Sequence, residues 1–198
     1  MHLEEALSSK MDIKAFIFDM DGLLFDSERI VQRSWEMAGD ELGIPHMGDV
    51  IYHTLGMNRT GRNEYFRKYI REDFPFEEFG RLTRDNFWKI VDKEGLPLKK
   101  GVKELLAYGK AQGYKMAVAT SSSREYAMGN LIRAGIDSYF DSVVCGDMVK
   151  KAKPDPEIYQ KACESLGIQP EYCMAFEDAP GGILSAHQAG TVSYTHLT

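Results

Sequence analysis

The sequence predicts an α/β fold, with a parallel β-sheet packed between helices and a long helical insert after the first strand. Four short apolar segments lack polar alternation, which is typical of strands buried on both faces of a parallel sheet. Segments of helical period separate the later strands, and such alternation implies right-handed crossovers. The predicted strands are residues 14–18, 115–120, 142–145 and 173–177.

Apolar residues at helical spacing predict three helices among these strands, and helix-end signals support two of them. Gly135 follows the last periodic residue of one segment, where glycine readily takes the left-handed conformation that ends a helix. Asp155 is a candidate N-cap of another helix, and Pro156 suits its first helical position. These helices are expected at residues 101–112, 124–134 and 155–166.

The segment between the first two predicted strands is far longer than a crossover needs and has no strand character. Its apolar residues follow helical spacing in residues 27–42, 60–70 and 77–94. Because ligands bind outside the carboxyl ends of the strands in an open α/β sheet, we expect this insert to cover the ligand site. The expected organisation is a core of residues 13–25 and 99–190, a helical insert of 26–98, a polar lead-in of 1–12 and an atypical tail of 191–198.

Composition and charge narrow the range of partners. The 198 residues carry a net charge of −6, which argues against binding to a nucleic-acid backbone. No apolar run approaches the roughly 20 residues that span a bilayer, and the N-terminal residues lack the apolar centre of a signal peptide. The three cysteines form no C-x-x-C pair and suit a reducing compartment. We expect a cytoplasmic monomer with no nucleic-acid or membrane partner.

Polar side chains that can perform chemistry follow each of the four predicted strands. Since the carboxyl ends of parallel strands meet at one edge of a sheet, these side chains should converge on one crevice. They are Asp19 and Asp21 after the first strand, Thr120, Ser121 and Ser122 after the second, Lys153 after the third, and Glu177 and Asp178 at the fourth.

These residue types suit phosphoryl transfer. Mg²⁺ prefers one or two carboxylates plus phosphate oxygens, and Asp19 and Asp178 can supply the carboxylates. A carboxylate such as Asp19 can attack phosphorus and form an aspartyl-phosphate. Asp21 can protonate the leaving group and then activate water. Thr120 and the amides that follow it can donate to phosphoryl oxygens, while Lys153 can neutralise negative charge.

Each motif taken alone also has an ordinary structural explanation. The Asp19–Gly22 segment could be a simple turn. A calcium-binding loop would need an acid or Asn at its fifth position and Glu at its twelfth, where Leu23 and Ile30 stand, so that alternative fails. The serine run could cap a helix, as could the Glu177-Asp178 pair. The joint occurrence of the motifs, in this order and at strand ends, favours a catalytic function.

The four motifs together closely resemble the haloacid dehalogenase (HAD) superfamily, and more narrowly its branch of β-phosphoglucomutases and sugar-phosphate phosphatases. The resemblance covers roughly residues 13 to 190 and implies a Rossmann-like three-layer core with an inserted helical cap. It implies Asp19 as nucleophile and Asp21 as general acid/base. It also implies Mg²⁺ held by the Asp19 carboxylate, the Asp21 carbonyl and Asp178, with Glu177 close by. The transferring phosphoryl group would be bound by Thr120, Ser121 and Lys153.

The insert bears on the substrate and on the reaction type. The resemblance implies that Arg59, Trp35 and Ser122 contact the substrate outside the transferring phosphoryl group. β-Phosphoglucomutases carry a histidine on the first cap helix, and Val31 stands at the matching position. We therefore expect hydrolysis of a small phosphorylated metabolite, in particular a sugar phosphate, with a sugar phosphomutase as the alternative.

The end of the chain departs from the family pattern. After Gly190 the family continues with another strand and helix, whereas residues 191–198 look unrelated. The resemblance therefore suggests truncation near Gly190, with loss of an edge strand and exposure of the strand before it. Two further alternatives stay open: a non-catalytic phosphoacceptor module, and an inactive fragment.

Overall fold

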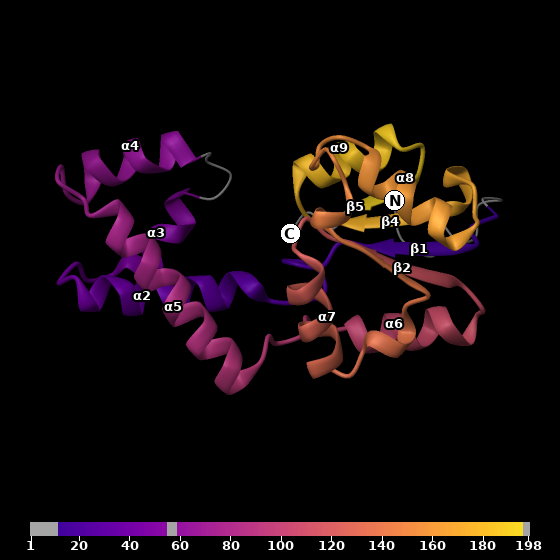
Figure 1. The fold of residues 1–198 in the computed structure, drawn as a ribbon, viewed down its shortest axis with the longest axis horizontal. Helices are drawn as coiled ribbons and strands as arrows, with labels where there is room; N and C mark the ends of the chain where they lie inside the picture. The colour runs from indigo at the N-terminus through magenta and orange to yellow at the C-terminus, as the bar shows by residue number, and fades with distance from the viewer. Residues whose placement is uncertain (1–11, 55–58, 196–198) are drawn as a thin grey trace. The chain divides into compact units, whose positions relative to one another are not determined.

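The structure, a computed structural model, describes residues 12–54 and 59–195. It divides into two compact units (Figure 1). The core unit is formed by the chain before Ser27 and after Leu96, and the insert unit is Ser27–Leu96. Among the described residues, none of the helices combines the length and apolar character needed to cross a bilayer.

The core unit is built on a five-stranded parallel sheet of order β3-β2-β1-β4-β5. Strand β1 is central, and its residue Phe18 lies level with Val118 of β2 and Phe176 of β4. The carboxyl ends of these three strands therefore lie side by side, which confirms the predicted fold class. The strands are β1 (Ala15–Phe18), β2 (Lys115–Ala119), β3 (Ser142–Val144), β4 (Cys173–Glu177) and β5 (Val192–Thr195).

Helices cover both faces of this sheet, as a three-layer fold requires (Figure 1). Alternate residues of β1 point to opposite faces. Ala15 and Ile17 join a hydrophobic cluster with residues of helix α8 (Glu157–Leu166), whereas Phe18 stacks on Phe176 with ring centroids 4.7 Å apart. The helices are α8 (Glu157–Leu166) and α9 (Pro180–Gln188) on one face, and α6 (Val102–Ala111) and α7 (Arg124–Arg133) on the other.

Strand β5 corrects an expectation from the sequence. We expected the chain after Gly190 to lack the edge strand beside β4, but Val192–Thr195 forms that strand. Val192 pairs with Met174, and the parallel register continues to the end of β4. The expectation was wrong because an edge strand needs mainly backbone pairing and a few residues of high β-propensity, which this short segment offers.

The chain leaves the core unit and re-enters it at neighbouring positions. The backbone N–H of Asp26 donates to the carbonyl of Pro97 at 2.9 Å. Phe25 and Leu98 form an isolated antiparallel bridge. Contacts within the core unit therefore hold the two chain segments that flank the insert beside each other.

The insert unit is helical, and Trp35 lies in its hydrophobic core. The indole of Trp35 meets the rings of Phe66 and Phe79 edge-on, with centroids 5.6 Å away in both cases. Only 6% of Trp35 is exposed, as expected for a side chain that packs in the core of the insert unit. The helices are α2 (Ser27–Glu41), α3 (Met47–Thr54), α4 (Arg59–Tyr69) and α5 (Phe76–Glu94).

Helix α3 is an element that the sequence did not predict. It is short and carries β-branched residues that lower intrinsic helix propensity. Tertiary contacts compensate, because Met47 and Val50 are buried in the hydrophobic core of the insert unit. In addition, the Glu36 carboxylate accepts a hydrogen bond from Gly48 N at 2.7 Å, which satisfies a free N–H of the first turn.

The packing of Trp35 yields a first prediction. Trp35→Ala should lower the free energy of unfolding of the insert unit by about 3–5 kcal/mol, since it removes a buried aromatic side chain. Trp88→Ala is the matched control, because Trp88 is 45% exposed and should cost less than about 1 kcal/mol. Denaturant titration followed by circular dichroism measures both, and equal effects would contradict the assigned burial.

Candidate active site

Strand β1 and the turn after it place Asp19. The Asp19 N–H donates to Phe176 O at 3.0 Å, so the aspartate is still held by the sheet. Gly22 then turns the chain with φ of +85°, a conformation that glycine adopts without strain. A Cβ on Gly22 would overlap the Asp178 carboxylate. Glycine at this position therefore allows the first motif and the fourth to approach closely.

Lys153 joins the ends of three strands. Its ammonium donates to Asp19 Oδ1 at 2.7 Å, to Glu177 Oε1 at 2.5 Å and to the carbonyl of Ala119 at 2.9 Å. All three donors of the ammonium are thus used, each toward a different strand end. The lysine side chain is only 10% exposed, so these contacts act in a largely desolvated site.

Glu177 is fixed from two further directions. The Tyr159 hydroxyl donates to Glu177 Oε1 at 2.6 Å, and both residues are buried. Burial and the neighbouring Glu177 carboxylate raise the pKa of Tyr159, so the phenol keeps its proton and remains a donor. Gly182 of α9 faces the same carboxylate, and a Cβ there would overlap it. Helix α9 can pack against Glu177 only because this position is glycine.

Three carboxylates of the core unit could hold a metal ion. Oxygen atoms of Asp19, Glu177 and Asp178 all lie within 4.8 Å of one another. Lys153 uses one oxygen of Asp19 and one of Glu177. Three negative charges and one positive charge leave a formal charge of −2 in the group. Hard oxygen donors with excess negative charge fit a divalent cation such as Mg²⁺.

The electrostatics of the group reflect burial and crowding. Burial raises the pKa of Asp19 to about 7, with Lys153 opposing the shift and Glu177 adding to it. Burial alone would lower the pKa of Lys153, but the charges of Asp19 and Glu177 outweigh it and raise that pKa above its usual value. The lysine therefore stays charged and balances part of the carboxylate charge.

Asp21 belongs to a second group of polar contacts. Its Oδ2 accepts a hydrogen bond from the Ser122 hydroxyl at 2.8 Å, and its Oδ1 accepts one from the Tyr126 hydroxyl at 3.2 Å. The serine is itself held, because its N–H donates to Thr120 Oγ1 at 3.1 Å and its carbonyl accepts from Gly146 N at 2.9 Å. The carboxyl ends of β1 and β2 are thus linked through side chains.

The structure brings most of the sequence-predicted site residues together in the core unit. Thr120 is buried at the end of β2, and the exposed Ser121 follows it, with its backbone against Gly146. Trp35 and Arg59 belong to the insert unit, where Trp35 is a core residue and Arg59 begins α4. The Arg59 side chain and residues 55–58 lie outside the described residues.

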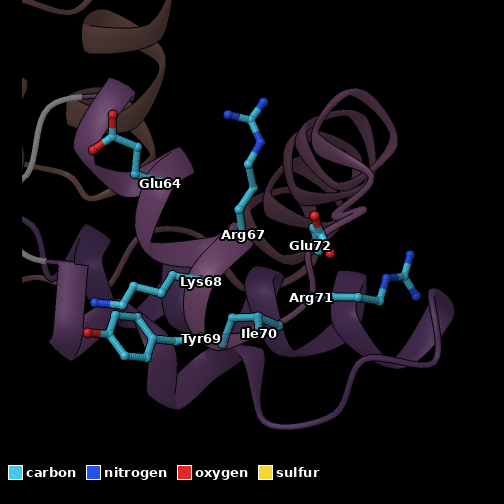
Figure 2. Close-up of a pocket in the computed structure, with 7 residues that line it drawn as sticks. All are labelled: Glu64, Arg67, Lys68, Tyr69, Ile70, Arg71 and Glu72. Atoms are coloured by element: carbon cyan, nitrogen blue, oxygen red, sulfur yellow. The ribbon is translucent and has the colours of Figure 1, made fainter.

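A pocket on the insert unit involves none of the predicted site residues (Figure 2). Its volume is about 650 Å³, and its charged lining includes both signs. The side chains of Arg67, Lys68 and Arg71 extend in different directions, so their charges do not converge on one position (Figure 2). We assign this pocket no role. Its lining residues are Glu64, Arg67, Lys68, Tyr69, Ile70, Arg71 and Glu72.

Sequence reasoning missed three residues that contact the predicted groups, namely Tyr126, Tyr159 and Gly182. Tyr126 lies in the first turn of α7, and no local pattern indicates that its hydroxyl contacts the first motif. Tyr159 is on the predicted inner face of its helix, which indicated burial but not a partner. Gly182 follows another glycine, and only the packed structure distinguishes the two.

The two adjacent glycines of α9 provide the second prediction. Gly182→Ala should displace the Glu177 carboxylate, which would lower kcat/KM for phosphate-ester hydrolysis by about tenfold or more and stability by about 1–3 kcal/mol. Gly181→Ala is the control, because nothing lies within 4 Å of a Cβ there. It should stabilise the helix by up to about 1 kcal/mol. Assays and thermal unfolding of both variants test this, and an active Gly182→Ala enzyme would contradict the assigned contact.

Comparisons with known proteins agree with this geometry. Residues 13–190 match the family described as haloacid dehalogenase-like hydrolase. The chain is 33% identical over 178 residues to the phosphorylated carbohydrates phosphatase of Thermotoga maritima, with 90% of this chain and 82% of that protein covered. It is 31% identical over 180 residues to hexitol phosphatase A of Escherichia coli, covering 91% and 81% respectively.

A solved structure gives the same assignment. The HAD family hydrolase from Deinococcus radiodurans, determined with bound phosphate and sodium, superposes with a TM-score of 0.81 at 25% identity, covering 94% of this chain and 81% of that one. One conclusion follows from the sequence motifs, the sheet order, the acidic group around Lys153 and these similarities. The chain belongs to the haloacid dehalogenase-like hydrolases and is a phosphatase-type member of that family.

Proposed function

We propose that this protein is a Mg²⁺-dependent phosphatase that hydrolyses a small phosphorylated metabolite, in particular a sugar phosphate, through an aspartyl-phosphate. The observation that carries the proposal is the contact of Lys153 with both Asp19 and Glu177 at the carboxyl edge of the sheet. Two relatives, named phosphorylated carbohydrates phosphatase and hexitol phosphatase A, support the substrate class.

The acidic group supports the choice of cofactor. Asp19 and Asp178 would hold Mg²⁺ together with the backbone carbonyl of Asp21, and Glu177 would stand beside it. When bound, the ion supplies positive charge that neutralises the phosphoryl oxygens. Gly22 keeps the space next to the Asp178 carboxylate open, since a Cβ there would fill it.

The proposed reaction consists of two successive displacements at phosphorus. A carboxylate oxygen of Asp19 attacks phosphorus, the bond from phosphorus to the ester oxygen breaks, and that oxygen takes a proton from Asp21. Water then attacks the phosphorus of the aspartyl-phosphate, Asp21 accepts the proton of the water, and phosphate and the Asp19 carboxylate are released. Lys153 stays charged throughout and supplies positive charge beside the phosphoryl group, while Thr120 and Ser121 hold the phosphoryl oxygens.

The nucleophile gives the third prediction. Asp19→Asn should lower phosphate release by about 10³-fold or more, because the amide cannot form the phosphoenzyme. Asp12→Asn is the control, since this exposed residue precedes the opposite end of β1. The assay measures phosphate release from a panel of hexose and hexitol phosphates with Mg²⁺. Full activity of Asp19→Asn would rule out the assigned nucleophile.

The same panel separates hydrolysis from the alternative reaction. A phosphomutase would convert a hexose phosphate into its isomer when primed with a bisphosphate, and Val31 stands where such enzymes are expected to carry a histidine. Release of phosphate without isomerised sugar supports the phosphatase, and isomer as the main product overturns it. No turnover of any ester by the wild-type chain would overturn the enzymatic function itself.

Metal removal gives the fourth prediction. Dialysis against EDTA should abolish turnover, and added Mg²⁺ should restore it. Asp178→Asn should raise the Mg²⁺ concentration for half-maximal activity by about 10–100-fold, because one carboxylate ligand is lost. Glu171→Gln, at an exposed acid near the amino end of β4, should leave that concentration unchanged. Activity that survives EDTA would contradict the metal requirement.

A further inference from the structure

The Tyr126 hydroxyl contacts a group that the proposed mechanism uses, although no motif includes this residue. It lies 3.2 Å from Asp21 Oδ1, while Ser122 Oγ lies 2.8 Å from Asp21 Oδ2. The two hydroxyls therefore hold the two oxygens of one carboxylate. Two attachments restrict rotation of the carboxylate about its Cβ–Cγ bond, which one hydrogen bond would not do.

The fold fixes both hydroxyls before any substrate arrives. Tyr126 occupies the first turn of α7, where its N–H donates to the N-cap hydroxyl of Ser123 at 3.4 Å. Its carbonyl accepts from the buried Asn130 amide at 2.9 Å. Ser122 is held by Thr120 and Gly146, as described above. The carboxylate of Asp21 is thus held by groups that are themselves anchored to β2 and α7.

Tyr126 is suited to remain the donor in this contact. Its side chain is partly buried, and burial together with the neighbouring Asp21 raises the pKa of the phenol. It keeps its hydrogen and donates rather than accepts. Each carboxylate oxygen has a second lone pair, so the two hydroxyls leave room for the proton that Asp21 would carry.

We propose that Tyr126 is a positioning residue that, with Ser122, orients the Asp21 carboxyl toward the ester oxygen of the substrate. The inference rests on the proposed function, in which Asp21 gives its proton to the ester oxygen as the bond from that oxygen to phosphorus breaks. Tyr126 itself neither gains nor loses a proton. Its contribution is geometric, because a misplacement of about 1 Å in a catalytic group can cost about 100-fold in rate.

Leaving-group dependence tests this geometry. Phenyl phosphate has a poor leaving group that needs the proton of Asp21, whereas p-nitrophenyl phosphate has a good leaving group that scarcely needs it. The two esters are alike in shape, and kcat/KM for each reports the first displacement. Tyr126→Phe should lower kcat/KM for phenyl phosphate by about 10–100-fold and for p-nitrophenyl phosphate by less than about threefold.

Two reference variants complete the experiment. Asp21→Asn should show the same selective loss, at least as large as that of Tyr126→Phe. Tyr108→Phe, which removes the hydroxyl of an exposed tyrosine on α6, should match the wild type on both esters. Tyr126→Phe keeps the ring, and thermal unfolding checks that its fold is intact.

The outcomes separate the inference from the proposed function. A selective loss in both Asp21→Asn and Tyr126→Phe supports the positioning role. A selective loss in Asp21→Asn with none in Tyr126→Phe overturns the positioning role and leaves the function standing. An equal loss on both esters in Tyr126→Phe also overturns it, since the role would then be merely structural. If Asp21→Asn shows no selective loss, the role of Asp21 as general acid is overturned.

Discussion

The ammonium of Lys153 allows several carboxylates to share one buried site. Buried like charges repel strongly at low dielectric, and removal of a single partner leaves an uncompensated charge. Lys153 meets this constraint by contacting Asp19 and Glu177 while also donating to the carbonyl of Ala119. The parallel register of β1, β2 and β4 is what brings these three acceptors to one point.

Much of this architecture could be predicted because it depends on local patterns. Buried parallel strands read as short apolar runs, and the polar residues directly after them must lie at the carboxyl edge of the sheet. Asp19, Lys153, Glu177 and Asp178 were therefore predictable as neighbours from the order of their motifs. The structure shows this grouping, although the chemical role of each member stays a prediction.

Other features depend on tertiary context and could not be predicted in this way. Helix α3 has a weak local signal and is stabilised by burial of Met47 and by the carboxylate of Glu36. The partner of Tyr126 comes from a segment 105 residues away, so no local pattern reveals it. Gly181 and Gly182 look equivalent in the sequence, yet only the second faces Glu177. Strand β5 shows that a segment with an atypical sequence can still pair with β4 as the edge strand of the sheet.

The hydrogen bond between Asp26 and Pro97 has a consequence for how such a protein can diversify. The residues that flank Ser27–Leu96 are hydrogen-bonded to each other within the core unit. The core unit therefore already holds the two ends of this segment together. The entropy of closing a loop grows only slowly with its length. A segment of different size or sequence could therefore replace this one at little cost to the sheet.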